Sequence, residues 1–248
     1  MKLKNKLLIL LFFCIYSAFS QKSGMAYYKK TPTELYTKRM DSLNNLYSDS
    51  TFKEIGEKMK DLKFELLFNP EVAHFREVES MSNDSRNSAS VKIAKITSGY
   101  SGDIYYDFKV KKVITETDIS GQTYLIEKDF SSYDWVLTKE KLIINGLSCY
   151  KAKTTIIKEG RSGVIEQAIV AWYAIDITVS AGPDGFAGLP GLIIQLENEK
   201  YVTVLDKIVF KKEPIEIELP LDGKKMTQTE FKDLMKKMSE SRGSSSRN

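Results

Sequence analysis

The feature that most restricts the fold is a long series of short strand-forming segments joined by short turns. Apolar residues alternate with polar ones in several of these segments, as in Leu62, Phe64, Leu66 and Phe68. Because parallel strands need long crossovers, the short connections predict antiparallel neighbours. The predicted strands span residues 23–30, 62–68, 72–78, 104–110, 112–117, 122–130, 135–137, 142–144, 150–157, 168–175, 192–196, 201–210 and 215–219.

So many consecutive strands exceed what a flat sheet accommodates. The predicted fold class is therefore mainly β (α+β), with a single strongly curved antiparallel sheet or an open half-barrel. No linker-like stretch interrupts the series, so residues 21–240 are predicted to form one domain. Residues 81–90 are polar and rich in turn formers, which predicts a surface loop.

Helices are predicted at two places in this domain. Capping boxes that begin at Thr31 and Thr51 predict a helical insert over residues 31–60. A third capping box begins at Thr227 and predicts a C-terminal helix over residues 226–240. Its apolar stripe is expected to pack on the sheet and comprises Phe231, Leu234, Met235 and Met238. Residues 241–248 contain no apolar residue and are predicted to form a disordered tail.

The densest cluster of turn residues is the stretch SAGPDGFAGLPGLIIQ at residues 180–195. It could be a phosphate-binding loop or a corner that leads the chain into a strand. A phosphate loop requires a following helix and a Lys-Ser/Thr pair, but no lysine occurs between Lys158 and Lys200. The corner interpretation is therefore favoured. It predicts a type II turn centred on Pro190 and Gly191, with a positive φ at Gly191.

The first twenty residues have the pattern of a secretory signal peptide. Lys2, Lys4 and Lys6 precede an apolar run, and cleavage is expected between Ser20 and Gln21. The apolar run is too short to span a bilayer. Lipidation at Cys14 is the alternative, although a lipoprotein signal has a small residue where Phe13 stands. The sequence thus predicts a periplasmic or secreted protein that is not integral to the membrane after cleavage.

Removal of this leader changes the charge and the cysteine count. The formal net charge is +4, and loss of the three leader lysines leaves +1. This value argues against nucleic acid or acidic lipid as the main partner. Cys149 would be the only remaining cysteine, so no internal disulfide is expected.

Residues for the common catalytic mechanisms are scarce. His74 is the only histidine, which argues against a histidine-based zinc site, and no Gly-x-Ser-x-Gly motif occurs. Cys149 has neither a cationic neighbour nor a helix start beside it, so it is interpreted as structural. We therefore expect no enzymatic activity, no cofactor and no metal.

The acidic residues add little to this picture. One set could serve glycoside hydrolysis, but its spacing is equally typical of a solvated strand face. This set is Glu166, Asp176, Asp184 and Glu197. A second set does not follow the spacing of an EF-hand calcium loop. It consists of Asp103, Asp107 and Asp118.

Three stretches resemble a known family. The hexapeptide is Gly188-Leu189-Pro190-Gly191-Leu192-Ile193, and the other two stretches are residues 144–152 and 172–177. Together they resemble the GLPGLI family of secreted Bacteroidota proteins over roughly residues 24–220. Ala174 and Thr178 stand where that family usually has Thr and Pro. The resemblance implies export and a largely antiparallel β fold, and it implies no established activity.

Two functions fit these observations. The first is a non-catalytic protein that binds an apolar ligand, a lipid or a lipoprotein in the curved sheet. The residues expected at its open face are Trp172, Phe186, Leu189 and Leu192; the alternative is that they belong to an ordinary core. The second function is that of a structural or adaptor protein in the cell envelope. It would act through an exposed sheet edge or the C-terminal helix.

Overall fold

A computed structural model describes residues 23–47, 50–78, 89–100, 102–160 and 163–245. The predicted signal peptide, most of the predicted surface loop at 81–90 and the last three residues of the predicted tail lie outside the described residues.

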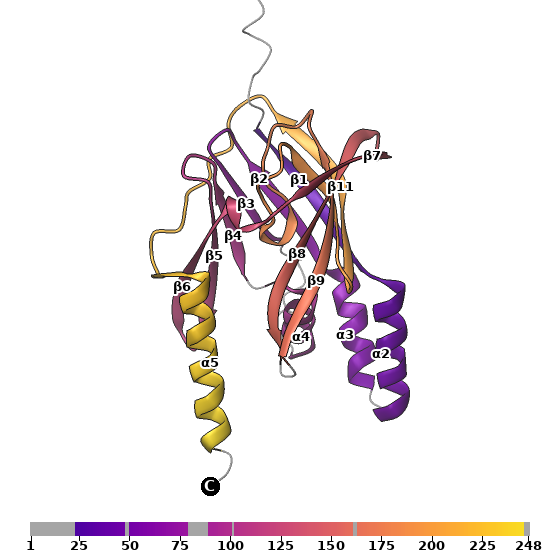
Figure 1. The fold of residues 1–248 in the computed structure, drawn as a ribbon, viewed down its shortest axis with the longest axis vertical. Helices are drawn as coiled ribbons and strands as arrows, with labels where there is room; N and C mark the ends of the chain where they lie inside the picture. Colours follow the sequence, from indigo (N-terminus) through magenta and orange to yellow (C-terminus); the bar gives the residue numbers. More distant parts are fainter. Residues whose placement is uncertain (1–22, 48–49, 79–88, 101, 161–162, 246–248) are drawn as a thin grey trace, which may run out of the picture.

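The strands form one open sheet of 12 strands in the order β12-β6-β5-β4-β3-β2-β1-β11-β10-β9-β8-β7 (Figure 1). Every neighbouring pair is antiparallel except β12 and β6, which are parallel. The prediction of a mainly β, open sheet is confirmed. The strands are β1 (Ser23–Pro32), β2 (Lys63–Phe68), β3 (Val72–Glu77), β4 (Asp103–Asp107), β5 (Lys112–Ile119), β6 (Gln122–Asp129), β7 (Val136–Ile144), β8 (Leu147–Gly160), β9 (Gly163–Ala174), β10 (Leu192–Glu197), β11 (Tyr201–Lys211) and β12 (Lys224–Thr227).

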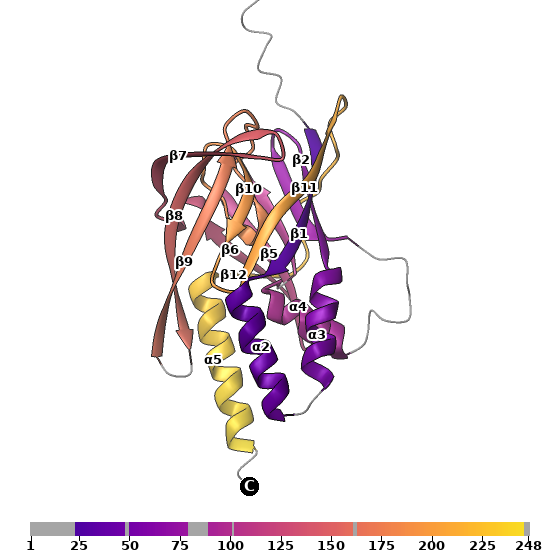
Figure 2. The same ribbon diagram turned by 90° about the vertical axis from the view of Figure 1, so that its right-hand side faces the viewer.

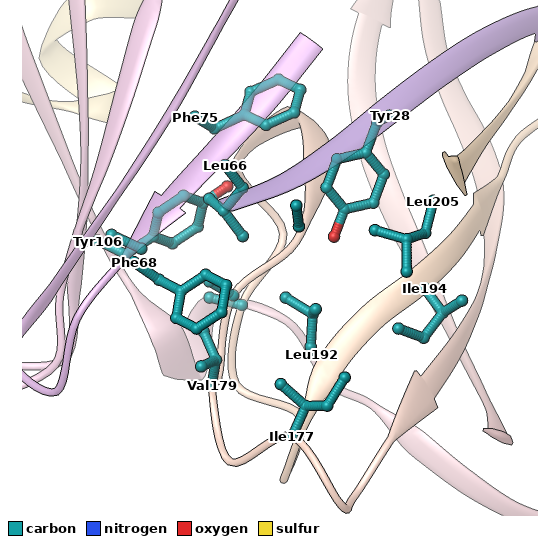
Figure 3. Packing of buried hydrophobic residues seen from close by; sticks show 14 of the residues in the cluster. Tyr28, Leu66, Phe68, Phe75, Tyr106, Ile177, Val179, Leu192, Ile194 and Leu205 are labelled. Atoms are coloured by element: carbon teal, nitrogen blue, oxygen red, sulfur yellow. The ribbon is translucent and has the colours of Figure 1, made fainter. Parts of the chain in front are cut away.

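The sheet is strongly curved (Figures 1 and 2). Buried apolar side chains fill its interior. The larger cluster joins residues of β1 to β5 with residues of the segment that precedes β10, as Figure 3 shows for Phe68, Tyr106 and Val179. A second cluster contains Phe186 and Leu189 of the same segment together with residues of β8, β9 and β10. Segment 175–191, which we call the glycine-rich segment, therefore takes part in both clusters.

Two helices, α2 (Glu34–Tyr47) and α3 (Ser50–Asp61), lie between β1 and β2. The predicted caps differ from the observed ones. The N-cap of α2 is Thr33, whose Oγ1 accepts a hydrogen bond from the Tyr36 backbone N–H at 3.2 Å. Thr31, the predicted cap, belongs to β1 and is paired with Val202 of β11. Thr51 lies inside α3, which begins one residue earlier.

Two other segments differ from the sequence-based prediction. Residues 89–98 form a helix, α4 (Ala89–Ser98), where no regular element was predicted. Its Ala94 packs with Ile55, Met59 and Tyr201, which gives this short helix its tertiary support. The predicted strand at 215–219 is absent, and residues 212–223 carry no regular element. Prolines flank the predicted strand on both sides, and proline cannot donate a ladder hydrogen bond.

The C-terminal helix α5 (Gln228–Ser245) is longer and less buried than predicted. Thr227 caps it as expected, because its Oγ1 accepts from the Glu230 backbone N–H and Glu230 accepts from the Thr227 N–H. The prediction that its apolar stripe packs on the sheet is met at Phe231 but not at Met235. Phe231 packs edge-on against Tyr124 of β6, but Met235 is exposed, and the helix runs away from the sheet (Figure 1). The helix continues to Ser245, five residues beyond the predicted end at 240.

Candidate functional site

Residues 181–187 of the glycine-rich segment lie in the interior of the molecule, apart from the half-buried Asp184, and aromatic side chains satisfy their backbone. The Tyr106 hydroxyl donates to the Gly182 carbonyl at 2.5 Å and accepts from the Gly185 N–H at 3.0 Å. Tyr133 donates to the Gly185 carbonyl at 3.1 Å, and the Trp135 indole N–H donates to the Ala187 carbonyl at 2.8 Å. Because buried backbone groups need partners, these contacts allow an irregular segment to lie inside the sheet.

Removing the Tyr106 hydroxyl tests this role. We expect Tyr106→Phe to lower the free energy of unfolding by about 1–3 kcal/mol, because it leaves a buried carbonyl and a buried N–H without their partner. Urea denaturation followed by circular dichroism measures the change. Tyr27→Phe is the matched control, since among the described residues the Tyr27 hydroxyl donates only to the sulfur of Met25, at 3.7 Å. Equal stability of the two variants would contradict the role given to Tyr106.

Glycines in this segment permit close approach as well as unusual backbone angles. A Cβ on Gly182 would lie 2.5 Å from the Ile193 Cβ, and one on Gly191 would lie 2.2 Å from the Ala174 carbonyl oxygen. Gly188 has φ +90°, whereas Gly191 is not among the glycines of positive φ. The predicted type II turn with positive φ at Gly191 is therefore wrong. Gly191 is required because the backbone of β9 passes directly beside it.

A buried ion pair fixes the segment to the sheet. The Lys30 ammonium of β1 lies 2.7 and 2.8 Å from the two carboxylate oxygens of Asp184 and donates to the Ser98 carbonyl at 2.9 Å. The side chains of Lys30 and Asp184 are only 2% and 15% exposed. Asp184 belongs to the short 3-10 turn η3 (Pro183–Gly185) and has φ +57°. The pair thus joins β1, α4 and η3 at one point.

The four predicted ligand-binding residues belong to two packing clusters. Phe186 and Leu189 are buried in the cluster with β8 and β9, and Leu192 is buried in the larger cluster (Figure 3). Trp172 is half-buried against the larger cluster, and the Lys151 ammonium lies 5.4 Å from its ring centroid. A surface groove of about 470 Å³ lies elsewhere, between Met25 and residues 211–215. The structure therefore does not gather the four residues at this groove.

The remaining candidates have separate surroundings. His74 Nε2 lies 2.9 Å from Asp103, and its ring stacks on Tyr105 at 4.1 Å. Burial works against ionisation of Asp103, but hydrogen bonds from His74 and Tyr100 outweigh it and lower the pKa of this carboxyl. Cys149 is buried in the larger cluster, and burial raises its thiol pKa. No His74–Cys149 contact occurs in the described part of the chain.

The acidic candidates are distributed over different elements. Glu166 and Asp176 are exposed, Asp184 pairs with Lys30, and Glu197 accepts from the Gln195 amide at 2.6 Å. Asp107 accepts from the N–H groups of Lys109 and Val110, and Asp118 accepts from the Thr123 hydroxyl. Within the described ranges, no group of three or more His, Cys, Asp or Glu side chains could hold a metal ion.

Exposed apolar side chains are concentrated at one end of the sheet. Of the fifteen exposed large apolar side chains among the described residues, seven lie on β7, β8 and β9. β7 is the last strand of the sheet, and the β8–β9 hairpin extends from the sheet toward the helical end of the molecule (Figures 1 and 2). We call this set the ribbon surface; its residues are Val136, Leu137, Leu142, Ile143, Ile157, Val164 and Ile165.

Sequence reasoning missed Lys30, Tyr106 and the ribbon surface. Lys30 did carry a signal, because it follows Ala26 and Tyr28 at alternate positions of a strand and therefore shares their buried face. The exposed apolar residues of β7 gave no such signal, since a strand of the interior and an edge strand can have the same composition.

Comparisons with known proteins describe the fold more than the function. A family model described as "Protein of unknown function (Porph_ging)" matches residues 158–195, which include β9, the glycine-rich segment and the start of β10. The match contains the six residues of the GLPGLI resemblance but covers too little of the chain to establish membership of either family. No curated protein sequence matches the chain significantly.

Two crystal forms of PNGF-II have a similar fold. In space groups C2 and P21 the TM-scores are 0.52 and 0.51, each at 13% identity and over 86% of this chain. This chain matches 32% of the PNGF-II chain, so the shared unit is about a third of that protein.

None of the described helices has the length and apolarity needed to cross a membrane.

Proposed function

We propose that the protein is exported and acts as an adaptor by binding an extended segment of a partner protein along β7. The observation that carries this proposal is the ribbon surface. Exposed apolar side chains at the edge of a sheet are typical of sites where another strand is added, because the edge also offers unpaired N–H and C=O groups. The signal-peptide pattern of residues 1–20 supports export.

The charges of β7 indicate what the partner segment contains. In the described part of the chain, Lys139 and Lys141 form no ion pair, whereas Glu140 is paired with Lys151 at 2.7 Å. The central part of β7 is also irregular, because three residues between Leu137 and Lys141 lie opposite Lys151 alone. Such a bulge limits indiscriminate edge pairing. The proposed partner segment is therefore extended, with apolar residues around an acidic centre.

An apolar-ligand carrier fits the geometry less well. Phe186, Leu189 and Leu192 are all buried and pack against protein side chains in two different clusters. Binding by the ribbon surface needs no rearrangement of these clusters, because its side chains are already exposed.

Purification from the native host tests the proposal. The tagged wild-type protein is expected to retain one stoichiometric partner, and the variant Leu137→Lys/Ile143→Lys is expected to bind it about tenfold more weakly or worse. These two residues of β7 are 55% and 74% exposed, so the substitutions should leave folding intact. Leu221→Lys is the control, since Leu221 is 83% exposed and lies outside the ribbon surface.

Several outcomes would contradict the adaptor function. Retention of the partner by the double variant would place the contact elsewhere on the molecule. Co-purification of a lipid with no protein partner would favour the carrier. A dimer of this chain that the same double variant abolishes, measured by light scattering, would show that β7 binds a second copy instead.

A further inference from the structure

The last part of the chain, residues 212–245, is attached to the rest of the molecule by a small contact. It consists of residues 212–223, which carry no regular element and which we call the strap, followed by β12 and α5. We call residues 212–245 the C-terminal unit. From residue 212 to residue 238 none of the described side chains is buried. Regions with few buried side chains open at a lower free energy than the core does.

The strand of this unit is held by a short ladder. β12 is the last strand at its end of the sheet and pairs with β6 in a parallel ladder of four residue pairs, the first of which is Lys224 with Tyr124. On its other side β6 pairs with β5 in an antiparallel ladder of eight residue pairs. Parallel pairing is also slightly less stable per residue. β12 is therefore held on β6 less firmly than β5 is.

The helix of this unit adds one ring contact near its start. Phe231 packs edge-on against Tyr124 of β6, with ring centroids 6.5 Å apart. Farther along the helix Met235 is exposed, and α5 stands apart from the other helices (Figure 1). The Thr227–Glu230 capping box joins the helix directly to the end of β12. Because the cap couples the two elements, β12 and the start of α5 are expected to leave β6 together.

The C-terminal unit covers an apolar part of β6. Leu125 and Ile126 are buried, but neither belongs to a core cluster of the sheet or of the helices. In the ladder they lie opposite Lys225 and Met226 of β12. The strap also reaches them, since a Cβ on Gly223 would lie 2.9 Å from the Leu125 Cγ. Removal of the unit would therefore expose apolar side chains beside unpaired N–H and C=O groups of β6.

We propose that the C-terminal unit is a detachable cover of the β6 edge. β12 and α5 separate from β6 together, the strap remains as the tether, and the rest of the sheet stays folded. The edge is occupied by β12 in the closed state and is free for pairing in the open state. This proposal is independent of the adaptor function, because β7 forms the opposite end of the sheet. Failure of one proposal therefore leaves the other unaffected.

Thiol labelling of the variant Leu125→Cys measures the opening. The thiol at position 125 lies under the C-terminal unit, whereas Cys149 is buried in the larger core cluster and reports on the rest of the sheet. Digestion and mass spectrometry read the two positions separately after exposure to a small thiol reagent. Position 125 is expected to be labelled about 100-fold faster than Cys149 or more. Its labelling should also depend less steeply on urea, because separation of the unit exposes less surface than global unfolding.

Two substitutions in α5 show whether the helix contact holds the cover. Added to Leu125→Cys, Phe231→Ala is expected to speed labelling at position 125 about tenfold and to leave Cys149 unchanged, because it removes the ring packed on Tyr124. Met235→Ala is the matched control on the same helix and is expected to change neither rate, since Met235 is exposed.

Hydrogen exchange of the wild-type protein guards against a loosening caused by Leu125→Cys itself. The amides of β12 and of residues 232–235 are expected to exchange with one common free energy of opening, lower than that of the β2 amides. The proposal is overturned if the β12 amides exchange only together with those of β2. Equal labelling rates at position 125 and Cys149, or equal effects of Phe231→Ala and Met235→Ala, would also overturn it.

Discussion

Replacing Lys30 by methionine is expected to lower the free energy of unfolding by about 3–5 kcal/mol, because the Asp184 carboxylate then stays buried without its cation. Methionine keeps most of the length of the side chain, so the change is mainly one of charge and hydrogen bonding. The Ser98 carbonyl also loses its donor. Urea denaturation at neutral pH measures the difference.

Two further variants separate this effect from a general loss of a surface charge. Lys29→Met removes the neighbouring lysine, whose ion pair with Asp206 is exposed, at 58% and 43%, and is expected to cost about 1 kcal/mol or less. The double variant Lys30→Met/Asp184→Asn removes both charges and is expected to be more stable than Lys30→Met alone. Asparagine tolerates the positive φ of residue 184. If Lys30→Met were as stable as Lys29→Met, the pair would have no structural role.

The position of this pair explains why a charge is buried at all. The apolar side chains of the glycine-rich segment pack in both clusters, and the ion pair adds a directional contact at η3. Lys30 and Asp184 are 154 residues apart in sequence, and their contact sets where η3 lies relative to β1. Directional contacts of this kind add specificity even where their net stabilisation is modest.

Sequence periodicity predicted the sheet better than it predicted the element boundaries. Side chains that alternate between the two faces of a strand leave a clear pattern, and Phe64, Leu66 and Phe68 are all buried as that pattern predicts. The cap of α2 was misplaced because β11 extends to Tyr201 and pairs with β1 as far as Pro32. Tertiary pairing there overrides a local capping signal that Thr31 satisfies equally well.

The candidate site was harder to predict because the same residues suit two environments. Phe186 and Leu189 in a loop of small residues could line an opening or anchor the loop in a core. Only the arrangement of β8 and β9 around them decides that they are buried. Likewise the hydroxyl of Tyr106 meets Gly182 across 76 residues, a contact that no local pattern reveals.

Alanine at Gly191 is expected to lower the free energy of unfolding by about 4 kcal/mol or more, or to prevent folding. Its Cβ would lie 2.2 Å from the Ala174 carbonyl oxygen and 2.7 Å from the carbonyl carbon. Neither backbone can move easily, because Leu192 pairs with Ala174 and also donates its N–H to the Ile177 carbonyl at 3.0 Å. Pro190→Ala, at the exposed neighbouring position, is expected to cost far less. Thermal and urea denaturation of both variants provide the comparison.

The variant Gly191→Asn tests whether glycine is needed at position 191 for close approach to β9 or for a positive φ. If residue 191 needed a positive φ, asparagine would be tolerated better than alanine, because it adopts that region more readily. The structure instead predicts that Gly191→Asn is at least as damaging as Gly191→Ala, since both add the Cβ that meets Ala174. At Gly188, φ is +90° and the atom nearest to an added Cβ would lie 3.1 Å away. There asparagine should be less damaging than alanine. If asparagine were instead milder than alanine at 191 and more damaging than alanine at 188, the glycine-rich segment would be held by its turn geometry and not by its fit against β9.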